Sequence, residues 1–260
     1  MIPSDTIHLW FCTLHKTIDP ALRERYENII SSDETERMER FSFEQHRLIF
    51  LIAHVFLREV LSRYMDCSPS SITYRLNPYG KPSLCLSADE SGVSFNLSHT
   101  DGLVCCAVVK EGDIGVDVES TKQSVSGDEI GERFFSTSES AEMMELESED
   151  VRNERFCRLW VLKEAYIKAK GMGLSLPLDL FSFHFLDEKK IDVKFDAELQ
   201  ESVDNWHFFL LKPTEQHRAA VAYKSIYPNR QVALKIFQTA PLCVERVIVL
   251  PLLGTCEPHN

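Results

Sequence analysis

The chain has 260 residues, of which 44% are hydrophobic, so it can bury the core of one large domain or of two similar lobes. Its formal net charge of −12 repels nucleic-acid phosphates and anionic lipid headgroups, which argues against both as main partners. Because no apolar run is long enough to cross a bilayer and the N-terminus lacks the features of a signal peptide, we expect a cytoplasmic protein.

The first half of the chain combines a strand, a helix and a strand pair. The apolar and aromatic segment 7–14 predicts a strand, and the apolar-periodic segment 46–64 predicts a buried helix. NPYGKP at 77–82 predicts a turn, because its Asn, Pro and Gly residues break regular structure. The segments 93–98 and 102–109 then predict two strands joined by the short connection HTD.

The eight cysteines include no CxxC pair and no cluster with the spacing of zinc ligands. We therefore interpret them as buried thiols. Cys105 and Cys106 lie in the apolar run VCCAVV, which is typical of a buried strand, so a structural role is favoured over a redox role.

The second half of the chain repeats this order of elements. IGVDVES at 114–120 predicts a strand, the region 131–146 contains a helix, and the acidic segment 147–154 is interpreted as a solvated connection. RLWVLKEAYIKAKG at 158–171 predicts a second helix. Strands are then predicted within 174–187, 191–199, 206–212 and 217–224.

We predict an α+β fold of two similar lobes related by pseudo-two-fold symmetry, each a helix packed on a small antiparallel sheet. The N-terminal lobe comprises residues 1–113 and the C-terminal lobe residues 114–230. Residues 231–260 form a C-terminal extension to which the sequence assigns no role.

Two carboxylates of segment 114–120 are expected on one face of its strand. Asp117 and Glu119 are two residues apart, and side chains alternate along a strand. Ile114, Val116 and Val118 should face a core, which leaves the carboxylates on the opposite face. An isolated pair of carboxylates at this spacing is as often a solvated surface pair as part of a functional site.

The second helix could add a third carboxylate. Trp160, Glu164 and Lys168 follow one another at i,i+4 steps, so they share one helix face. A Glu four residues before a Lys is also a common stabilising pair, worth about 0.2–0.5 kcal/mol. Joined with Asp117 and Glu119, however, Glu164 would complete an oxygen cluster suited to a hard divalent cation, for which Mg²⁺ is the natural candidate.

Such a cation needs an anionic ligand, and several side chains could contact phosphate. Each of them, taken alone, could equally be a solvated surface residue. Ser98 and His99 lie at the end of a predicted strand, where a hydroxyl and an imidazole can donate to phosphate oxygens. The candidate cations are Arg37, Arg40, Lys81, Lys163 and Lys168.

Taken in order, YGKP, FNLSHTDG, IGVDVES, ERFF and WVLKEAYIKAKG resemble the motifs of the 4'-phosphopantetheinyl transferases. The resemblance is to the longer, surfactin-synthetase-activating type, which has two similar lobes in one chain, and it spans residues from about 37 to 180. It implies transfer of the phosphopantetheine arm of coenzyme A to a serine of an apo acyl or peptidyl carrier protein. The reaction would depend on Mg²⁺ and release 3',5'-adenosine bisphosphate.

The resemblance also implies roles for individual residues. Asp117, Glu119 and Glu164 would coordinate Mg²⁺, while Glu164 would also take the proton of the serine and Lys168 would stabilise charge on the pyrophosphate. Arg37 follows Glu34 and Glu36, so this part of the chain is more acidic than is usual in the family. The residues expected to bind coenzyme A are Lys81, Ser98, His99, Arg37 and Lys163.

The carrier protein would contact apolar side chains near the site, although these could equally belong to the core. The candidates are Phe134, Phe135, Met143 and Met144. Because two lobes in one chain can complete the site, we expect a monomer. Two other functions stay open: another Mg²⁺-dependent enzyme that cleaves phosphodiesters, and a non-catalytic module that binds coenzyme A or carrier domains. A nuclease should show a basic stripe, and a pure binder of anions has no use for three clustered carboxylates.

Overall fold

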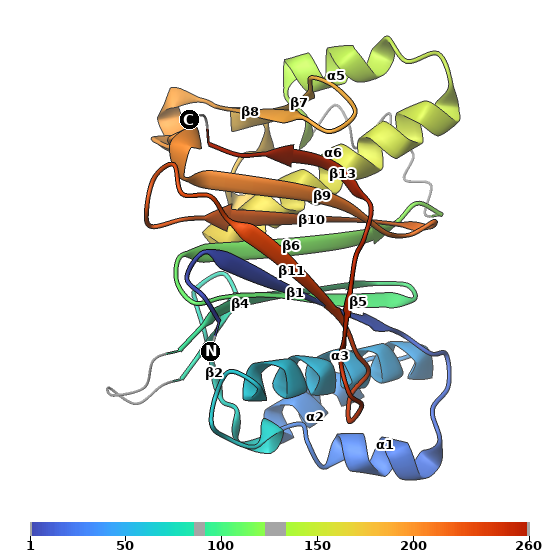
Figure 1. The fold of residues 1–260 in the computed structure, drawn as a ribbon. Coiled ribbons are helices and arrows are strands. Elements are labelled where there is room, and N and C mark those ends of the chain that lie inside the picture. The colour runs from blue at the N-terminus through green and yellow to red at the C-terminus, as the bar shows by residue number, and fades with distance from the viewer. Residues whose placement is uncertain (1, 86–91, 123–133, 259–260) are drawn as a thin grey trace.

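A computed structural model describes residues 2–85, 92–122 and 134–258 of the chain (Figure 1). The fold is a mixed α+β arrangement with two main sheets, as predicted. The helices of the first half lie at one end of the molecule and those of the second half toward the other end, with the sheets between them (Figure 1). Within the described part of the chain, no helix is long and apolar enough to cross a membrane.

The first sheet has five strands and contains one parallel pair. β1 (Thr6–Thr13) pairs in antiparallel fashion with β5 (Leu103–Val109), which pairs in the same way with β4 (Ser94–Thr100). On its other side β1 runs parallel to β11 (Ala233–Gln238), so the prediction of a purely antiparallel sheet is wrong here. β12 (Arg246–Ile248) completes the order β12-β11-β1-β5-β4.

The second sheet is antiparallel throughout, in the order β13-β9-β10-β6. Its strands are β6 (Asp113–Ser120), β9 (Trp206–Thr214), β10 (His217–Lys224) and β13 (Leu252–Cys256).

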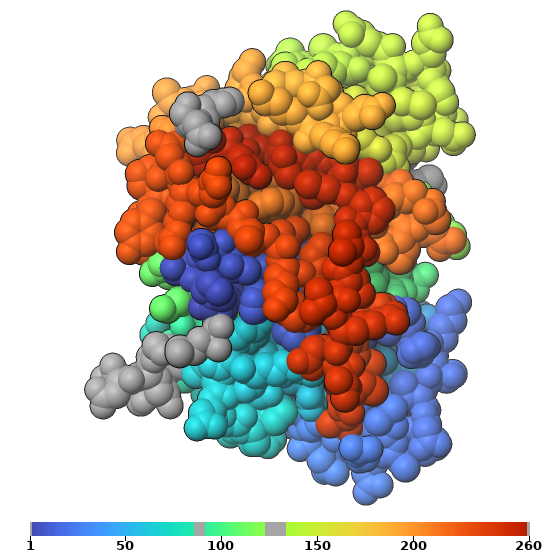
Figure 2. All heavy atoms as spheres, viewed as in Figure 1, coloured from blue at the N-terminus to red at the C-terminus, as the bar shows by residue number. Residues whose placement is uncertain are grey.

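The C-terminal residues therefore contribute to both sheets. β11 and β12 belong to the first sheet, while β13 belongs to the second. In the space-filling view these residues form a red band over the surface (Figure 2). The segment left without a role by the sequence thus connects the two sheets.

The long helix of the first half, α3 (Glu44–Ser62), covers the first sheet and confirms the helix predicted for 46–64. α1 (Pro20–Glu27) and α2 (Ser32–Glu39) pack beside it. Ser31 caps α2 through a capping box with Glu34, which satisfies two backbone N–H groups at the start of that helix. A short 3₁₀ turn (Pro69–Ser71) and the hairpin of β2 (Tyr74–Leu76) and β3 (Pro82–Leu84) follow, with the predicted turn between the two strands.

The long helix of the second half, α6 (Glu149–Lys170), packs on β6 and β10 and ends at Gly171 in a left-handed conformation with φ 67°. It begins earlier than predicted, so the interpretation of 147–154 as a connection is wrong for its last six residues. Glu149 and Asp150 lie in the first turn, where acidic side chains favour a helix N-terminus. The remaining elements are α5 (Thr137–Met144), β7 (Phe181–Phe185), β8 (Ile191–Phe195) and 3₁₀ turns at Gly173–Ser175, Leu178–Leu180, Ala197–Leu199 and Val203–Asn205.

Side chains of both sheets share one buried cluster, which includes Leu9 and Cys105 from the first sheet and Val116 and Val221 from the second. Cys105 and Cys106 are fully buried, as predicted. The prediction that all the cysteines are buried is wrong for Cys67, Cys85 and Cys243, which are exposed in loops, and for Cys256, which is half-buried.

Candidate active site

The alternation predicted for β6 is confirmed. Ile114, Val116 and Val118 are buried in the cluster shared by the two sheets, which directs Asp117 and Glu119 to the opposite face. That face is covered by α6. The two carboxylates therefore lie where the second sheet meets the helix that carries Glu164 and Lys168.

Gly115 determines how closely α6 approaches this strand. A Cβ atom at this position would lie 2.0 Å from the carbonyl oxygen of Ala165 and 2.4 Å from the backbone nitrogen of Ala169. Both distances are far below van der Waals contact, so only glycine permits this approach. The close contact brings the side chain of Lys168 to β6.

Asp117, Ser98 and Lys168 are joined by hydrogen bonds. The Oδ1 atom of Asp117 accepts hydrogen bonds from Ser98 Oγ at 2.8 Å and from Lys168 Nζ at 2.5 Å. Lys168 Nζ also donates to Ser98 Oγ at 3.0 Å. Asp117 is only 2% exposed, and its Oδ2 atom is buried without a hydrogen-bond partner among the described residues. One oxygen of this carboxylate is therefore left for another ligand.

Glu119 and Glu164 interact electrostatically with Asp117. Burial and the charge of Asp117 raise the pKa of Glu119 to about 7, and the same two causes raise the pKa of Glu164 to about 7. Thr100 Oγ1 donates to Glu119 Oε2 at 3.5 Å. Burial disfavours the charge of Lys168, but the Asp117 carboxylate outweighs it and raises the pKa of the ammonium. The site therefore contains more negative charge than Lys168 balances.

A divalent cation suits this set of side chains, although its ligands are not already in place. Across residues 2–85, 92–122 and 134–258, no three His, Cys, Asp or Glu side chains have a spacing that could hold a metal ion. The buried Oδ2 of Asp117, which has no hydrogen-bond partner among the described residues, is nevertheless a suitable oxygen ligand. A bound cation would also offset the charge of Asp117, which together with burial raises the pKa values of Glu119 and Glu164. To share an ion, the three carboxylates would have to come closer together than they lie here.

Two residues predicted to bind coenzyme A are accessible. His99 is exposed near the end of β4, and partial desolvation together with the charge of Lys168 lowers the pKa of its imidazole. Arg37 is exposed on α2, with its guanidinium carbon 5.7 Å from the centre of the Phe50 ring. The ring of His54 stacks on the same Phe50 at 3.9 Å.

Lys81 has a different environment from that expected of a phosphate ligand. Its Nζ donates to the carbonyl oxygen of Ile114 at 3.0 Å and to that of Ala169 at 2.8 Å, and burial lowers its pKa to about 8. These contacts tie the start of β6 to the end of α6. In this conformation the Lys81 ammonium donates to two backbone carbonyls rather than to a phosphate.

The assignment of Lys163 to coenzyme A is wrong. Its side chain is fully buried and forms an ion pair with Glu139 at 2.8 Å. Its Nζ also donates to the carbonyl oxygens of Leu178 and Phe181, each at 2.7 Å. Adjacent helix residues point about 100° apart, so Lys163 faces the core of the second half while Glu164 faces the site.

The apolar residues predicted to contact a carrier do not form one surface. Phe135 is 4% exposed and belongs to the core of the second half, and Met143 packs against that core. Met144 is 72% exposed. The ring of Phe134 lies 5.7 Å from that of Trp160. The prediction that all four residues contact the carrier is therefore wrong for Phe135, which is a core residue.

Two residues of β4 that the sequence reading did not single out also belong to the site. Asn96 Oδ1 accepts the backbone N–H of Val116 at 2.9 Å, and Thr100 contacts Glu119. Together with Ser98 they are spaced two apart, so these three side chains all face β6. That alternation was a signal available in the sequence.

Two family models match the chain in succession. The model for the N-terminal part of 4'-phosphopantetheinyl transferase matches residues 21–111, and that for the 4'-phosphopantetheinyl transferase superfamily matches residues 113–222. The chain is 34% identical over 171 residues to the 4'-phosphopantetheinyl transferase Sfp of Bacillus subtilis, covering 66% of this chain and 73% of that protein. It is 35% identical over 219 residues to the 4'-phosphopantetheinyl transferase HetI of a Nostoc species, covering 84% of this chain and 88% of that protein.

Proposed function

The chain belongs to the 4'-phosphopantetheinyl transferases, which transfer phosphopantetheine from coenzyme A to carrier proteins, and we propose that its reaction depends on Mg²⁺ and releases 3',5'-adenosine bisphosphate. The acceptor would be a serine hydroxyl of an apo acyl or peptidyl carrier protein. The observation that carries this proposal is the buried carboxylate of Asp117, whose Oδ1 accepts from Lys168 while its Oδ2 has no hydrogen-bond partner among the described residues.

Asp117, Glu119 and Glu164 are the residues that would hold the metal ion. A Mg²⁺ ion bound by their oxygens would supply the positive charge that neutralises the pyrophosphate of coenzyme A. The unpartnered Oδ2 of Asp117 supports this assignment, as do the raised pKa values of the two glutamates.

Lys168 and Glu164 would act on the reacting groups themselves. Lys168 keeps its charge beside Asp117 and would donate to a phosphate oxygen, stabilising the charge that develops as the bridging bond breaks. Glu164 would accept the proton of the serine hydroxyl, directly or through water. A carboxylate within hydrogen-bond reach of the serine hydroxyl can act as its general base.

Arg37, Ser98 and His99 would bind the 3'-phosphate and the adjoining groups of coenzyme A. The exposure of Arg37 and His99 supports this role, since both can reach a ligand without losing an ion pair in the described part of the chain. Lys81 would contribute by holding β6 against α6, and it could reach a phosphate only by giving up a carbonyl contact. We further propose that the protein acts in the cytoplasm. We also propose that it is a monomer, because one chain supplies all of these residues.

The experiment that tests the function is incubation with coenzyme A, Mg²⁺ and a panel of apo acyl and peptidyl carrier proteins, followed by mass measurement of each carrier. We expect the mass of one phosphopantetheine to be added to at least one carrier, and chelation of Mg²⁺ should abolish the addition. Cleavage of coenzyme A without a carrier would indicate a phosphodiester-cleaving enzyme instead. Binding of coenzyme A without turnover would indicate a non-catalytic module.

A further inference from the structure

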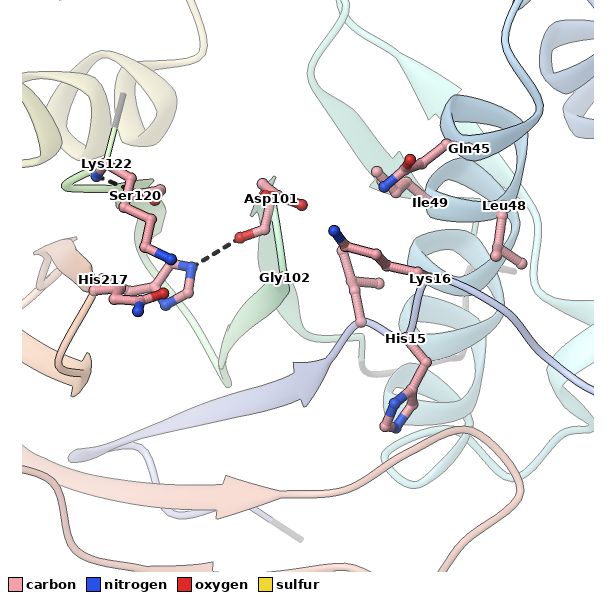
Figure 3. A pocket seen from close by; sticks show the side chains of 12 residues that line it. His15, Lys16, Gln45, Leu48, Ile49, Asp101, Gly102, Ser120, Lys122 and His217 are labelled. Carbon is pink, nitrogen blue, oxygen red and sulfur yellow. Dashed lines mark hydrogen bonds between the residues drawn. The ribbon is translucent and has the colours of Figure 1, made fainter. Parts of the chain in front are cut away.

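The first two residues of β10 point to opposite faces of the second sheet. His217 lines a cavity of about 240 Å³ together with Ser120 of β6, and its Nε2 lies 2.8 Å from the carbonyl oxygen of Asp101 (Figure 3). Side chains alternate along a strand, so Arg218 points to the other face, which is covered by α6. Arg218 is therefore directed to the same face as the carboxylates of the candidate active site.

Arg218 lies directly opposite Glu119 in the antiparallel register of β10 and β6. Directly opposite residues have their Cβ atoms about 4.5–5.5 Å apart and their side chains on the same face of the sheet. Opposite charges in such a pair attract each other, so an ion pair between this guanidinium and the Glu119 carboxylate is the arrangement that the register alone would produce.

In the described part of the chain, however, Arg218 forms its ion pair with Glu154 of α6. Its Nε donates to Glu154 Oε1 at 2.7 Å and its Nη2 donates to Oε2 at 2.8 Å. Bidentate bonds of this kind are among the strong hydrogen bonds of proteins. Nη1 donates to the carbonyl oxygen of His217 at 2.9 Å, so the whole guanidinium is turned away from Glu119.

Glu154 is itself held in place by a second arginine. Arg158, one helical turn further along α6, donates from Nε to Glu154 Oε1 at 2.7 Å. Burial would raise the pKa of Glu154, but the hydrogen bonds from Arg218 and Arg158 lower it. Glu154 is therefore charged at neutral pH and can retain both guanidinium groups.

The position of Arg218 affects the charge available to a metal ion. Asp117, Glu119 and Glu164 carry more negative charge than Lys168 balances, and this excess is what a divalent cation would neutralise. A guanidinium bound to Glu119 would supply positive charge from the protein itself and would occupy oxygens that are expected to bind the ion. Arg218 is thus a potential competitor of the metal, located one strand away from it.

We propose that Glu154 is a positioning residue, which holds Arg218 away from Glu119 and so keeps the Glu119 carboxylate free for a divalent cation. This inference rests on the proposed function. It extends the site to a side chain outside the set assigned to the metal, to coenzyme A or to the reacting groups.

The test is a cycle of three variants, Glu154→Gln, Arg218→Gln and the double variant. The probe is Mn²⁺, which takes the same oxygen ligands as Mg²⁺ and whose free concentration is measured by electron paramagnetic resonance, without coenzyme A or carrier. We expect Glu154→Gln to raise the Kd for Mn²⁺ roughly ten-fold or more, because the ion must displace a charge-assisted hydrogen bond of the released Arg218. Arg218→Gln should bind Mn²⁺ at least as tightly as wild type, and the double variant should recover to within about two-fold of wild type.

This pattern differs from that of a merely structural ion pair. If Glu154 and Arg218 only anchored α6 on β10, the loss of either partner would weaken Mn²⁺ binding and the double variant would not recover, which would overturn the proposal. Urea denaturation of all three variants measures the anchoring separately.

Glu142→Gln is the matched control for net charge. It removes the same charge from a residue of α5 that pairs with Arg155 and His184. Since salt screens exposed charges over about 8–10 Å, its Kd for Mn²⁺ should stay within about two-fold of wild type at physiological ionic strength. An equal rise of the Kd in Glu142→Gln and Glu154→Gln would overturn the proposal, because net charge alone would then explain the effect.

A crystal structure of Glu154→Gln tests the position of Arg218 without metal or turnover. We expect a guanidinium nitrogen within about 4 Å of a Glu119 oxygen, whereas a guanidinium that stays beside position 154 would refute the proposal. The two proposals fail in different ways. If the wild-type protein binds no Mn²⁺, the metal assignment fails and this inference fails with it. If wild type and Glu154→Gln bind Mn²⁺ equally well, only the role of Glu154 fails.

Discussion

Replacement of Gly115 by alanine tests whether close packing of α6 on β6 assembles the site. The new Cβ would lie 2.0 Å from the carbonyl oxygen of Ala165, whereas ordinary contact needs about 3.5 Å, so the helix must move by about 1.5 Å. The hydrogen bond of 2.5 Å between Lys168 and Asp117 would then lengthen toward about 4 Å and be lost.

Two quantities should change in Gly115→Ala. We expect the free energy of unfolding to fall by about 1–3 kcal/mol, as is typical of overpacking. The rate of transfer should fall by about 100-fold or more, since a displacement of about 1 Å can have that effect on a reacting group. Urea denaturation measures the first quantity, and the mass of the modified carrier over time measures the second.

Gly173→Ala is the matched control, because it makes the same chemical change at a position where no neighbour lies within 4 Å of the new Cβ. Its φ of 55° predicts a stability loss of about 1 kcal/mol from backbone strain, with the transfer rate unchanged. A Gly115→Ala variant that equals wild type in both stability and rate would refute the packing argument.

Three further predictions concern single side chains. Glu164→Gln should abolish transfer while the free energy of unfolding falls by less than about 1 kcal/mol, and full transfer in the presence of Mg²⁺ would contradict the role of this carboxylate. Lys163→Met should lower the free energy of unfolding by about 3–5 kcal/mol, because it leaves the fully buried Glu139 unpaired. If urea denaturation shows a loss of less than about 1 kcal/mol, the ion pair does not stabilise the fold as argued. Burial alone would raise the pKa of Glu34, but hydrogen bonds, led by that of His54, lower it from 4.5 to about 2. This difference corresponds to about 3 kcal/mol of stability, which should be present above pH 4.5 and be lost as the pH falls toward 2; urea denaturation at several pH values should show this loss in wild type but not in Glu34→Gln.

Much of the candidate site follows from local periodicity in the sequence. Side chains alternate along a strand, so the spacing of Asp117 and Glu119 and the apolar residues at the alternate positions, Ile114, Val116 and Val118, were enough to place both carboxylates opposite the core. The four-residue step from Glu164 to Lys168 likewise placed these two on one helix face. The family resemblance rests on the same short motifs, and the family models confirm it.

Periodicity could not determine which helix face meets which surface. Lys163 and Lys168 are both lysines of α6, yet the first is buried against Glu139 and the second donates to Asp117. The close approach at Gly115 decides which of them reaches the carboxylates, and that contact joins residues about fifty positions apart in the chain.

The C-terminal residues show the same limit. Their strands were not predicted, because a short strand is specified by the partners to which it hydrogen-bonds as much as by its own side chains. β11 adds to the first sheet beside β1, and β13 adds to the second beside β9. The sequence thus determined the family, the main elements and the faces on which the acidic residues lie. Only tertiary packing decided which cations face them, because long-range contacts leave no local period in the chain.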